Sequence, residues 1–410
     1  MKTLMTSIVL CFTLLVSAQQ QKTVDFGVED SIFSKVLNEH RKVWLYNPEK
    51  KSGIYQSNKV YPILYLLDGP THFHSVVGMI KQLSTANGNT VLPEMIIVGI
   101  HNTNRFRDLS PTQMIEKSGY TPDDMRKNTG GGDLFLDFIE KELKPYIESK
   151  YPTAPYSMLV GHSLGGMMAI YTMFQRPQMF QSYIAIDPSI WWNNQEILKE
   201  IQNRPNLNDL KGTSLYLGYA NTLVEGYDIS TVSKDTTEET LHIRSILSLD
   251  SYLKDNLIEE FRYKSQFYEN DTHGSVPLIT EYDGLRFLFE FHRIEINEKD
   301  FENMDVDMVA QIAGHYQNVS RYMGYEVKPD ESLINRLGYG MLNGKLYERA
   351  RQFFSFNAKI HSDSFNVFDS LGDYYLATNN KEKAAESYQK ALELKEYPLT
   401  REKLEQLKQQ

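Results

Sequence analysis

Short apolar runs alternate with amphipathic stretches between about residues 40 and 295 of the chain. Several runs are almost continuously apolar, which is typical of β-strands that helices cover on both faces. Their alternation with helical stretches predicts an α/β domain with a mainly parallel sheet, which we place at residues 25–295. The expected strands are 43–46, 61–67, 94–100, 156–161, 182–187, 214–220 and 263–268.

The clearest helical pattern in this domain covers residues 134–151. Its apolar positions Leu134, Phe138, Leu143 and Ile147 form one stripe, and charged residues occupy much of the remaining sequence. This distribution predicts an amphipathic helix.

The pattern changes after about residue 300, where strand-like runs end and helical spacing continues. A set of large, Leu-Gly, aromatic, Ala and small positions in 331–364 recurs 34 residues later in 365–398. It matches a tetratricopeptide repeat, in which Gly372 and Ala384 let two antiparallel helices approach closely. The recurring pairs are Ile334 and Phe368, Leu337 and Leu371, Gly338 and Gly372, Met341 and Tyr375, Ala350 and Ala384, Phe354 and Tyr388, and Asn357 and Ala391.

The first of the two copies is degenerate, because Asn357 stands where a small residue is usual. Two units are too few to be stable alone, so we expect helices within 301–326 to stack against them. The polar segment 401–410 is expected to form a capping helix. We place this α-helical region at residues 300–410. The alternative is a generic helical tail in which the repeat is accidental.

The first eighteen residues have the pattern of a secretory signal peptide. Lys2 precedes an apolar segment that ends at Ser17 and Ala18, which predicts cleavage after Ala18 and a periplasmic or secreted protein. The alternative is a membrane anchor, but the segment is short for a span. No other stretch is long and apolar enough, so we expect no stable membrane insertion. Cys11 is the only cysteine, so the mature chain would contain neither disulfides nor thiolate metal sites.

The charge of the chain bears on its partners. Hydrophobic residues make up 41% of the sequence and charged residues 23%, which is ordinary for a globular protein. The formal net charge of -10 argues against a nucleic-acid partner, because phosphate binding needs clustered Lys and Arg.

The hexapeptide GHSLGG at 161–166 carries a candidate nucleophile, Ser163. An apolar strand pattern precedes it and the helical stretch 167–175 follows it, which is the setting of a nucleophile elbow. Gly161, Gly165 and Gly166 would allow tight packing of strand and helix around a strained serine. The alternative is a glycine turn with an incidental serine.

A nucleophilic serine needs a base, and His273 is the candidate. In the α/β-hydrolase fold the chain order is serine, acid, histidine. His273 lies in a loop between the last expected strand and the last helix of the domain, where the base belongs. The alternative is a turn histidine among small polar residues. The other histidines after Ser163 fall in or beside helical stretches: His242, His292, His315 and His361.

The acid is less well defined by the sequence. It should follow the strand 214–220, where Glu225 is nearer the strand end and Asp228 lies further on. We favour Glu225 slightly over Asp228, and Asp187, after the preceding strand, is a third candidate. Each carboxylate could equally be a solvated loop residue.

The oxyanion hole is expected to combine the N–H of Leu164 with one from the loop after the strand 61–67. Pro70 has no N–H, so Gly69 is the expected donor and Thr71 the next. His72 and His74 follow, but neither an H-E-x-x-H motif nor an acidic cluster accompanies them, so we expect them to shape the pocket. No phosphate-binding or dinucleotide fingerprint occurs, and we expect neither a metal nor a cofactor.

Five motifs together resemble the putative esterase family of α/β-hydrolases, which includes enterochelin esterase-like enzymes and esterase D. They are YPILYLLDGPTHFHS (61–75), NTNRFRDLSPT (102–112), LVGHSLGGMMAIY (159–171), AIDPSIWW (185–192) and YENDTHGSVPL (268–278). The similarity covers roughly residues 25–295, and the motifs stand in the family's order.

The resemblance implies hydrolysis of carboxylic esters with Ser163 and His273 as catalytic residues. It also implies a substrate cleft near Trp191, Trp192 and Arg107. The two tryptophans could equally be core residues, and Arg107 could instead pair with Asp108 or another local carboxylate. Asp187 departs from the family, where a small neutral residue is more usual.

We therefore expect a serine esterase that acts on a small-molecule ester through an acyl-enzyme. A siderophore ester, an acetyl or feruloyl ester on a carbohydrate, and a small thioester all fit the sequence. The alternative is a catalytically silent hydrolase scaffold whose helical repeats bind a protein partner. Such a partner would also be compatible with an active esterase.

Overall fold

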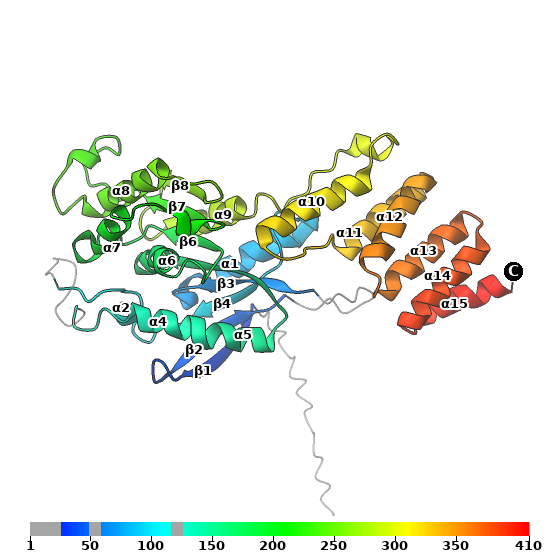
Figure 1. The fold of residues 1–410 in the computed structure, drawn as a ribbon, viewed down its shortest axis with the longest axis horizontal. Helices are drawn as coiled ribbons and strands as arrows, with labels where there is room; N and C mark the ends of the chain where they lie inside the picture. The colour runs from blue at the N-terminus through cyan, green and yellow to red at the C-terminus, as the bar shows by residue number, and fades with distance from the viewer. Residues whose placement is uncertain (1–25, 49–58, 116–125, 410) are drawn as a thin grey trace, which may run out of the picture.

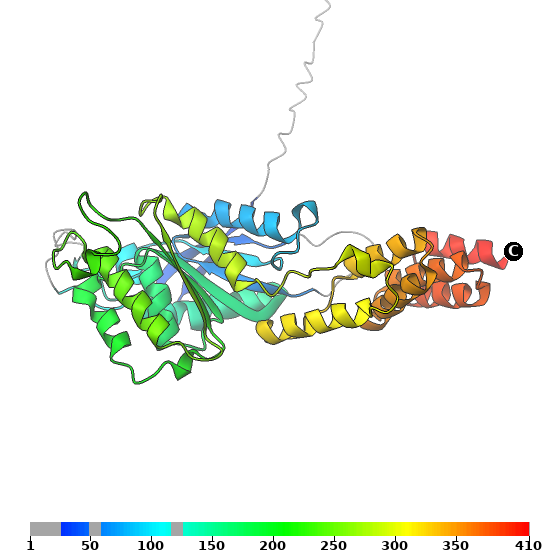
Figure 2. The same cartoon turned by 90° about the horizontal axis from the view of Figure 1, so that it is seen from above.

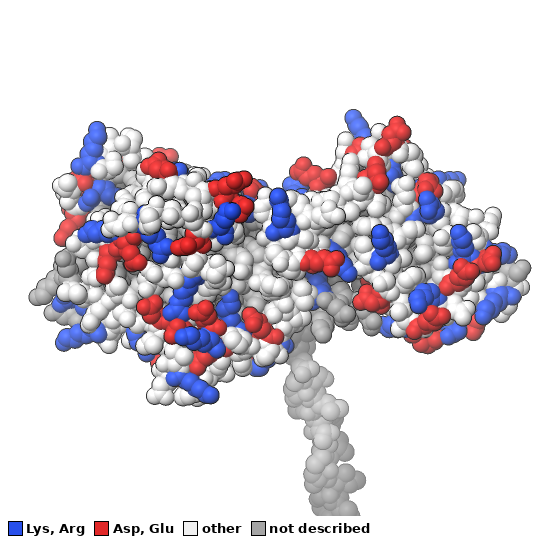
Figure 3. All heavy atoms as spheres, viewed as in Figure 1, with Lys and Arg blue, Asp and Glu red and all other residues white. Residues whose placement is uncertain are grey.

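The computed structural model describes residues 26–48, 59–115 and 126–409. The predicted signal peptide and its cleavage site after Ala18 lie outside these residues. Among the helices that are described, none is both long and apolar enough to cross a membrane. On the face shown in Figure 3, basic and acidic side chains are interspersed over both the sheet domain and the helical region.

Within the described residues, eight strands form one sheet in the order β1-β2-β4-β3-β5-β6-β7-β8 (Figure 1). β2 pairs antiparallel with β1 and β4, and all pairs from β4 to β8 are parallel. The mainly parallel α/β fold and the seven expected strands are thus confirmed. The bounds are β1 (Val28–Ser34), β2 (Glu39–Tyr46), β3 (Tyr61–Leu66), β4 (Ile96–Ile100), β5 (Thr153–His162), β6 (Ser182–Ile186), β7 (Ser214–Ala220) and β8 (Arg262–Tyr268).

Helices cover both faces of the sheet (Figures 1 and 2). One face packs against α1 (Gly69–Ser84) and α9 (Val276–Leu288). The other packs against α4 (Gly132–Phe138), α5 (Lys144–Lys150), α6 (Leu164–Gln175), α7 (Trp192–Gln202) and α8 (Leu241–Asp255). The short helix α2 (Arg105–Asp108) follows β4 in the chain. This two-sided cover explains why β3, β4, β6 and β7 are buried along their whole length and why β5 is mainly buried.

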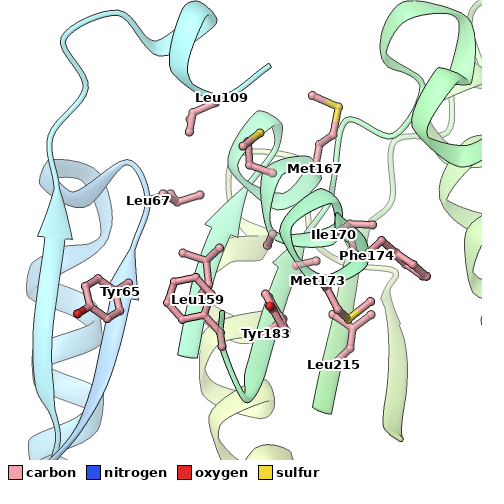
Figure 4. Packing of buried hydrophobic residues seen from close by; sticks show 14 of the residues in the cluster. Tyr65, Leu67, Leu109, Leu159, Met167, Ile170, Met173, Phe174, Tyr183 and Leu215 are labelled. Carbon is pink, nitrogen blue, oxygen red and sulfur yellow. The ribbon is translucent and has the colours of Figure 1, made fainter. Parts of the chain in front are cut away.

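The core is densest around α6, which is buried on almost every side. Met173 of this helix lies near Tyr183 of β6 and Leu215 of β7, in the same buried cluster as Met167, Ile170 and Leu159 (Figure 4). A helix that is apolar all round has no solvent face. The position of its first turn, which follows Ser163, is therefore fixed by the core.

The helix expected over 134–151 is present, but a π-helical turn at Ile139–Leu143 interrupts it between α4 and α5. Phe138, Leu143 and Ile147 are buried as predicted, whereas Leu134 is 55% exposed. Phe135 and Leu136 are buried together with Phe138, so Leu134 lies on the solvent side of α4. Including Leu134 in the apolar stripe was wrong.

Helix α10 (Met308–Met323) connects the sheet domain to the C-terminal helices (Figure 2). Val319 and Met323, near its end, belong to the core under α1 and α9. Met308 and Ile312, near its start, pack with Ile334 of the next helix. The expected helix within 301–326 is confirmed, and it joins two cores.

The C-terminal region contains two helix pairs followed by one more helix: α11 (Glu331–Asn343) with α12 (Tyr347–Ile360), α13 (Phe365–Ala377) with α14 (Lys381–Leu394), and then α15 (Pro398–Lys408). Gly338 lies against the ring of Phe354, and 34 residues later Gly372 lies against the ring of Tyr388. The recurrence found in the sequence is therefore a recurrence of the same contact, whereas its assignment to the tetratricopeptide class stays a prediction.

The degenerate position of the first pair has a structural explanation. Asn357 is fully buried, and its side-chain Nδ2 donates to the main-chain oxygen of Glu331 at 3.0 Å. The buried amide thus finds an acceptor in the main chain of α11, so a polar residue is tolerated at this position.

Two glycines of α11 give a matched test of this packing. A Cβ at Gly338 would lie 2.7 Å from the Phe354 ring, whereas a Cβ at Gly340 would meet no atom within 4 Å. We expect Gly338→Ala to lower the free energy of unfolding by about 1–3 kcal/mol through overpacking. Gly340→Ala should raise it by roughly 0.5–1 kcal/mol, because alanine is the better helix former. Urea unfolding measures both, and equal effects of the two substitutions would contradict the close contact.

Candidate active site

Ser163 occupies a sharp turn between β5 and α6. Its backbone has φ 59° and ψ -115°, a conformation that L-residues rarely adopt. A Cβ on Gly161 would lie 2.2 Å from the Gly165 oxygen, and one on Gly166 would lie 2.8 Å from the Ile186 oxygen. Glycine is therefore required at both positions. The geometry is that of the nucleophile elbow expected from the sequence.

Neighbouring strands hold this turn in place. Ser163 N–H donates to the Ile186 oxygen at the end of β6 (2.9 Å), and its own oxygen accepts from Ser189 N–H (3.0 Å). The Ser163 Oγ lies 3.2 Å from the Ser189 Oγ. The strained backbone costs on the order of 1–3 kcal/mol, and these bonds to the β6 edge help to maintain it.

Both predicted oxyanion donors begin helices at the carboxyl ends of adjacent strands. Leu164 opens α6 after β5, and Gly69 opens α1 after β3. The first N–H groups of a helix have no acceptor inside that helix, so they can serve a ligand. Thr71, the second candidate, already donates its N–H to the Asp68 oxygen at 2.9 Å. The structure thus places Gly69 better than Thr71 for this role.

His273 lies in the loop between β8 and α9, as predicted. Its Nδ1 is 2.6 Å from the Oδ2 of Asp187, and its ring centroid lies 4.5 Å from that of His162, the residue before Ser163. Asp187 follows β6 directly, is fully buried and has φ 41°. Its second oxygen, Oδ1, accepts from Ala220 N–H at 3.1 Å. The carboxylate is thereby fixed against one nitrogen of His273.

The preference for Glu225 as the acid, with Asp228 as alternative, is corrected by this contact. Both residues are exposed in the loop after β7, and Asp228 accepts from Ser230 N–H at 2.8 Å. The carboxylate at His273 is Asp187, the third candidate. It follows β6, which lies directly beside the strand that carries Ser163. Its sequence signal was its place immediately after a buried strand.

A second histidine, which the sequence placed in a helical stretch, shares this carboxylate. His242, near the start of α8, has its Nε2 3.2 Å from Asp187 Oδ2. Burial alone would raise the pKa of Asp187, but the contacts with His242 and His273 outweigh it and lower the pKa. Asp187 is therefore ionised when it holds His273.

Further titratable groups lie behind His273. Burial, reinforced by His273 and His72, lowers the pKa of His162 to about 4, so this ring is neutral near pH 7. The Nδ1 of His72 lies 3.1 Å from Glu281 on α9, whose pKa is raised by burial. His74 instead makes an edge contact with Trp44. Of the two histidines expected to shape the pocket, only His72 contacts the ring of His162, the neighbour of His273, among the contacts described.

The predicted substrate residues are largely engaged in structural contacts. Arg107 bonds Glu39 (2.6 Å) and Asp108 (2.7 Å), which is the ion-paired role that the sequence left open. Trp192 is only 2% exposed, and its Nε1 lies 3.4 Å from the Thr112 oxygen. Trp191 is partly buried against the same core. The structure thus favours the core alternative for Trp192.

A different arginine lies beside the candidate site. Arg105 donates two hydrogen bonds to the Asp68 carboxylate, of 2.7 and 2.8 Å. Its Nη2 also donates to the main-chain oxygen of His162 at 3.4 Å. Asp68 directly precedes Gly69 and has φ 52°. Arg105 thereby ties the loop of the expected oxyanion donor to the elbow. The sequence comparison instead suggested Arg107, two residues further along the chain, because both arginines occur in the motif at 102–112.

The chain is similar to known proteins in both sequence and fold. A family described as putative esterase matches residues 34–227. Over 258 residues the chain is 28% identical to the siderophore triacetylfusarinine C esterase of Aspergillus fumigatus. That match covers 57% of this chain and 84% of the relative. Over 149 residues it is 34% identical to the ferri-bacillibactin esterase BesA of Bacillus subtilis. That match covers 34% of this chain and about half, 52%, of the relative.

The crystal structure of an IroE-like serine hydrolase from Shewanella oneidensis is similar to this fold, with a TM-score of 0.68. The two sequences are 30% identical, and the match covers 82% of this chain and 99% of the other. The family match spans the sheet from β2 past β7 and includes the elbow at Ser163. From these similarities, the chain belongs to the putative esterase family and is a hydrolase of ester bonds.

Proposed function

We propose that this protein is a secreted or periplasmic serine esterase that cleaves a siderophore-type ester through an acyl-enzyme. The observation that carries the proposal is the 2.6 Å contact of His273 Nδ1 with Asp187, beside the strained turn at Ser163. Two relatives are described as esterases of siderophores, which supports this substrate class. A carbohydrate-linked ester is the alternative substrate.

In the proposed reaction, Ser163 Oγ attacks the ester carbonyl and passes its proton to His273 Nε2. Asp187 accepts the hydrogen bond from Nδ1–H, which leaves the lone pair of Nε2 free to act as base. The imidazolium formed then protonates the leaving alcohol. A water molecule, activated by the same nitrogen, hydrolyses the acyl-enzyme and regenerates Ser163.

The charges that develop have suitable neighbours. The N–H groups of Leu164 and Gly69 would hold the oxyanion, and losing one such donor typically reduces the rate by about 10²–10³-fold. The ionised Asp187 stabilises the imidazolium of His273. His162, in ring contact with His273, is neutral near pH 7 and therefore does not oppose this positive charge.

Replacing the candidate nucleophile tests the proposal directly. Wild-type protein should be labelled by a fluorophosphonate probe and should hydrolyse both a short p-nitrophenyl ester and a cyclic tri-ester siderophore. Ser163→Ala should lose labelling and hydrolysis, because no other group supplies the covalent intermediate. Intact-protein mass measures the label, and absorbance and chromatography measure the two products.

Hydrolysis of the p-nitrophenyl ester without the siderophore would refute the substrate class alone. Labelling of Ser163→Ala equal to wild type would refute the nucleophile. A folded wild-type protein that is neither labelled nor active would instead favour the scaffold alternative, with the C-terminal helices as the binding part.

The identity of the acid has its own test. Asp187→Asn should reduce kcat by about 10²–10⁴-fold, because an amide at this position no longer fixes the Nδ1–H tautomer of His273. Glu225→Gln is the matched control and should retain wild-type kcat, since Glu225 is exposed and lies in the next loop. A larger loss for Glu225→Gln than for Asp187→Asn would overturn the assignment. Circular dichroism checks that both variants fold.

The proposed location rests on the N-terminal sequence pattern. Export from a bacterial host should yield a mature protein that begins at Gln19, because Ser17 and Ala18 provide the small residues that signal peptidase prefers. Intact mass of the periplasmic fraction measures the cleavage. Recovery of the uncleaved chain in the membrane fraction would favour the anchor alternative.

A further inference from the structure

We propose that Asp187, His242 and His273 form a binding site for Zn²⁺ and that the bound ion switches the hydrolase off; the inhibitory part rests on the proposed function. The three side chains come from different parts of the fold: the end of β6, the start of α8 and the loop before α9. Their ligand atoms all lie within 4.8 Å of one another.

The donor set suits zinc. Imidazole nitrogen and carboxylate oxygen are common zinc ligands, with bonds of about 2.0–2.2 Å, so neighbouring ligand atoms of a tetrahedral site lie roughly 3.3 Å apart. Asp187 Oδ2 is 3.2 Å from His242 Nε2 and 2.6 Å from His273 Nδ1. Only the second distance has to widen. A fourth position would remain for water.

His242 contributes a nitrogen that faces the same carboxylate oxygen as His273. Within the part of the chain that the structure describes, its buried Nε2 has no hydrogen bond of good geometry, although Asp187 is close. A buried polar atom with a poorly aligned partner is less stable than one with a good partner, so a better ligand at this nitrogen would be favourable. A cation between Nε2 and the carboxylate would satisfy both.

The site has one fixed and two accessible sides. Asp187 has no exposed surface, and its Oδ1 accepts from Ala220 N–H. The side chains of His242 and His273 are 21% and 44% exposed, so an ion would approach between them. Because His273 stands in a loop, it can give the few tenths of an ångström that coordination needs.

Coordination would disable the base through its tautomer. Zinc takes the Nδ1 lone pair, so the proton that Nδ1 carried is lost to solvent and Nε2 takes one up, with no net change in protons. A neutral His273 with Nε2–H cannot accept the proton of Ser163. The ion also removes Asp187 from its role as hydrogen-bond acceptor. Binding and catalysis therefore exclude each other.

Binding is tested without reference to activity. Calorimetric titration of Zn²⁺ into the full mature chain carrying Ser163→Ala, with a tag that does not bind metal, should show one ion per protein. Adding His242→Gln should weaken binding by about tenfold or more, because glutamine lacks the nitrogen ligand. His40→Gln, an exposed strand residue, is the matched control and should bind as the parent does. Absent binding, or binding that His242→Gln does not change, would overturn the site.

The inhibitory role is tested on the chain with Ser163 intact. Zn²⁺ should abolish hydrolysis of a p-nitrophenyl ester, EDTA should restore it, and His242→Gln should need at least about tenfold more Zn²⁺ for the same fractional inhibition. Each variant is compared with its own metal-free rate. Stoichiometric binding without inhibition would overturn the switch. Zinc binding by a protein that hydrolyses no ester in any condition would instead refute the proposed function and leave the metal site standing.

Discussion

The close approach of β5 and α6 is the constraint on which the candidate site depends. Gly161 faces the main chain of Gly165, and Gly166 faces that of Ile186, with no room for a side chain at either glycine. α6 is buried almost throughout, so the core fixes its axis and hence the turn that precedes it. Ser163 is consequently held in a conformation that it would not adopt in a free loop. The strain at one residue is maintained by the packing of a whole helix.

The second constraint is electrostatic. Asp187 is a carboxylate without solvent contact, and such a charge is tolerated only with compensating partners. Ala220 N–H provides one, and two imidazoles provide the others. A single acid–base pair would need only one imidazole at Asp187, and the structure places two there. The same oxygen of Asp187 faces both imidazoles, so the carboxylate that we propose to orient His273 also belongs to the proposed set of metal ligands.

Much of the fold follows from the sequence because buried parallel strands are mainly apolar. β3, β4 and β7 are examples, with every residue buried. β1 was missed because it pairs with β2 alone at the sheet edge, where alternating polar residues face solvent. Leu134 was misplaced because it was grouped with Phe138 one turn later, whereas the residues buried beside Phe138 in α4 are Phe135 and Leu136.

The residues of the candidate site also differ in how well the sequence predicts them. Ser163, Leu164 and Gly69 could be placed because local turn geometry demands them. The acid could not, because its identity depends on which loop folds back to His273 across the strand ends. Asp187 and Glu225 both follow strands of the sheet, and the sequence contains no record of the 2.6 Å contact that distinguishes them. The contact of His242 with Asp187 could not be predicted for the same reason, because a position in a helical stretch does not indicate which carboxylate lies opposite.

The C-terminal helices are not independent of this site. Val319 and Met323 of α10 belong to the same core as Val76 of α1 and Leu285 of α9. α1 begins at the expected oxyanion donor Gly69, and α9 follows the loop of His273. Removal of residues 300–410 would therefore uncover apolar surface beneath both helices and change hydrolysis through the core. Because of this coupling, the role of the helical region has to be distinguished from that of the sheet domain by surface substitutions on α11 to α15 rather than by truncation.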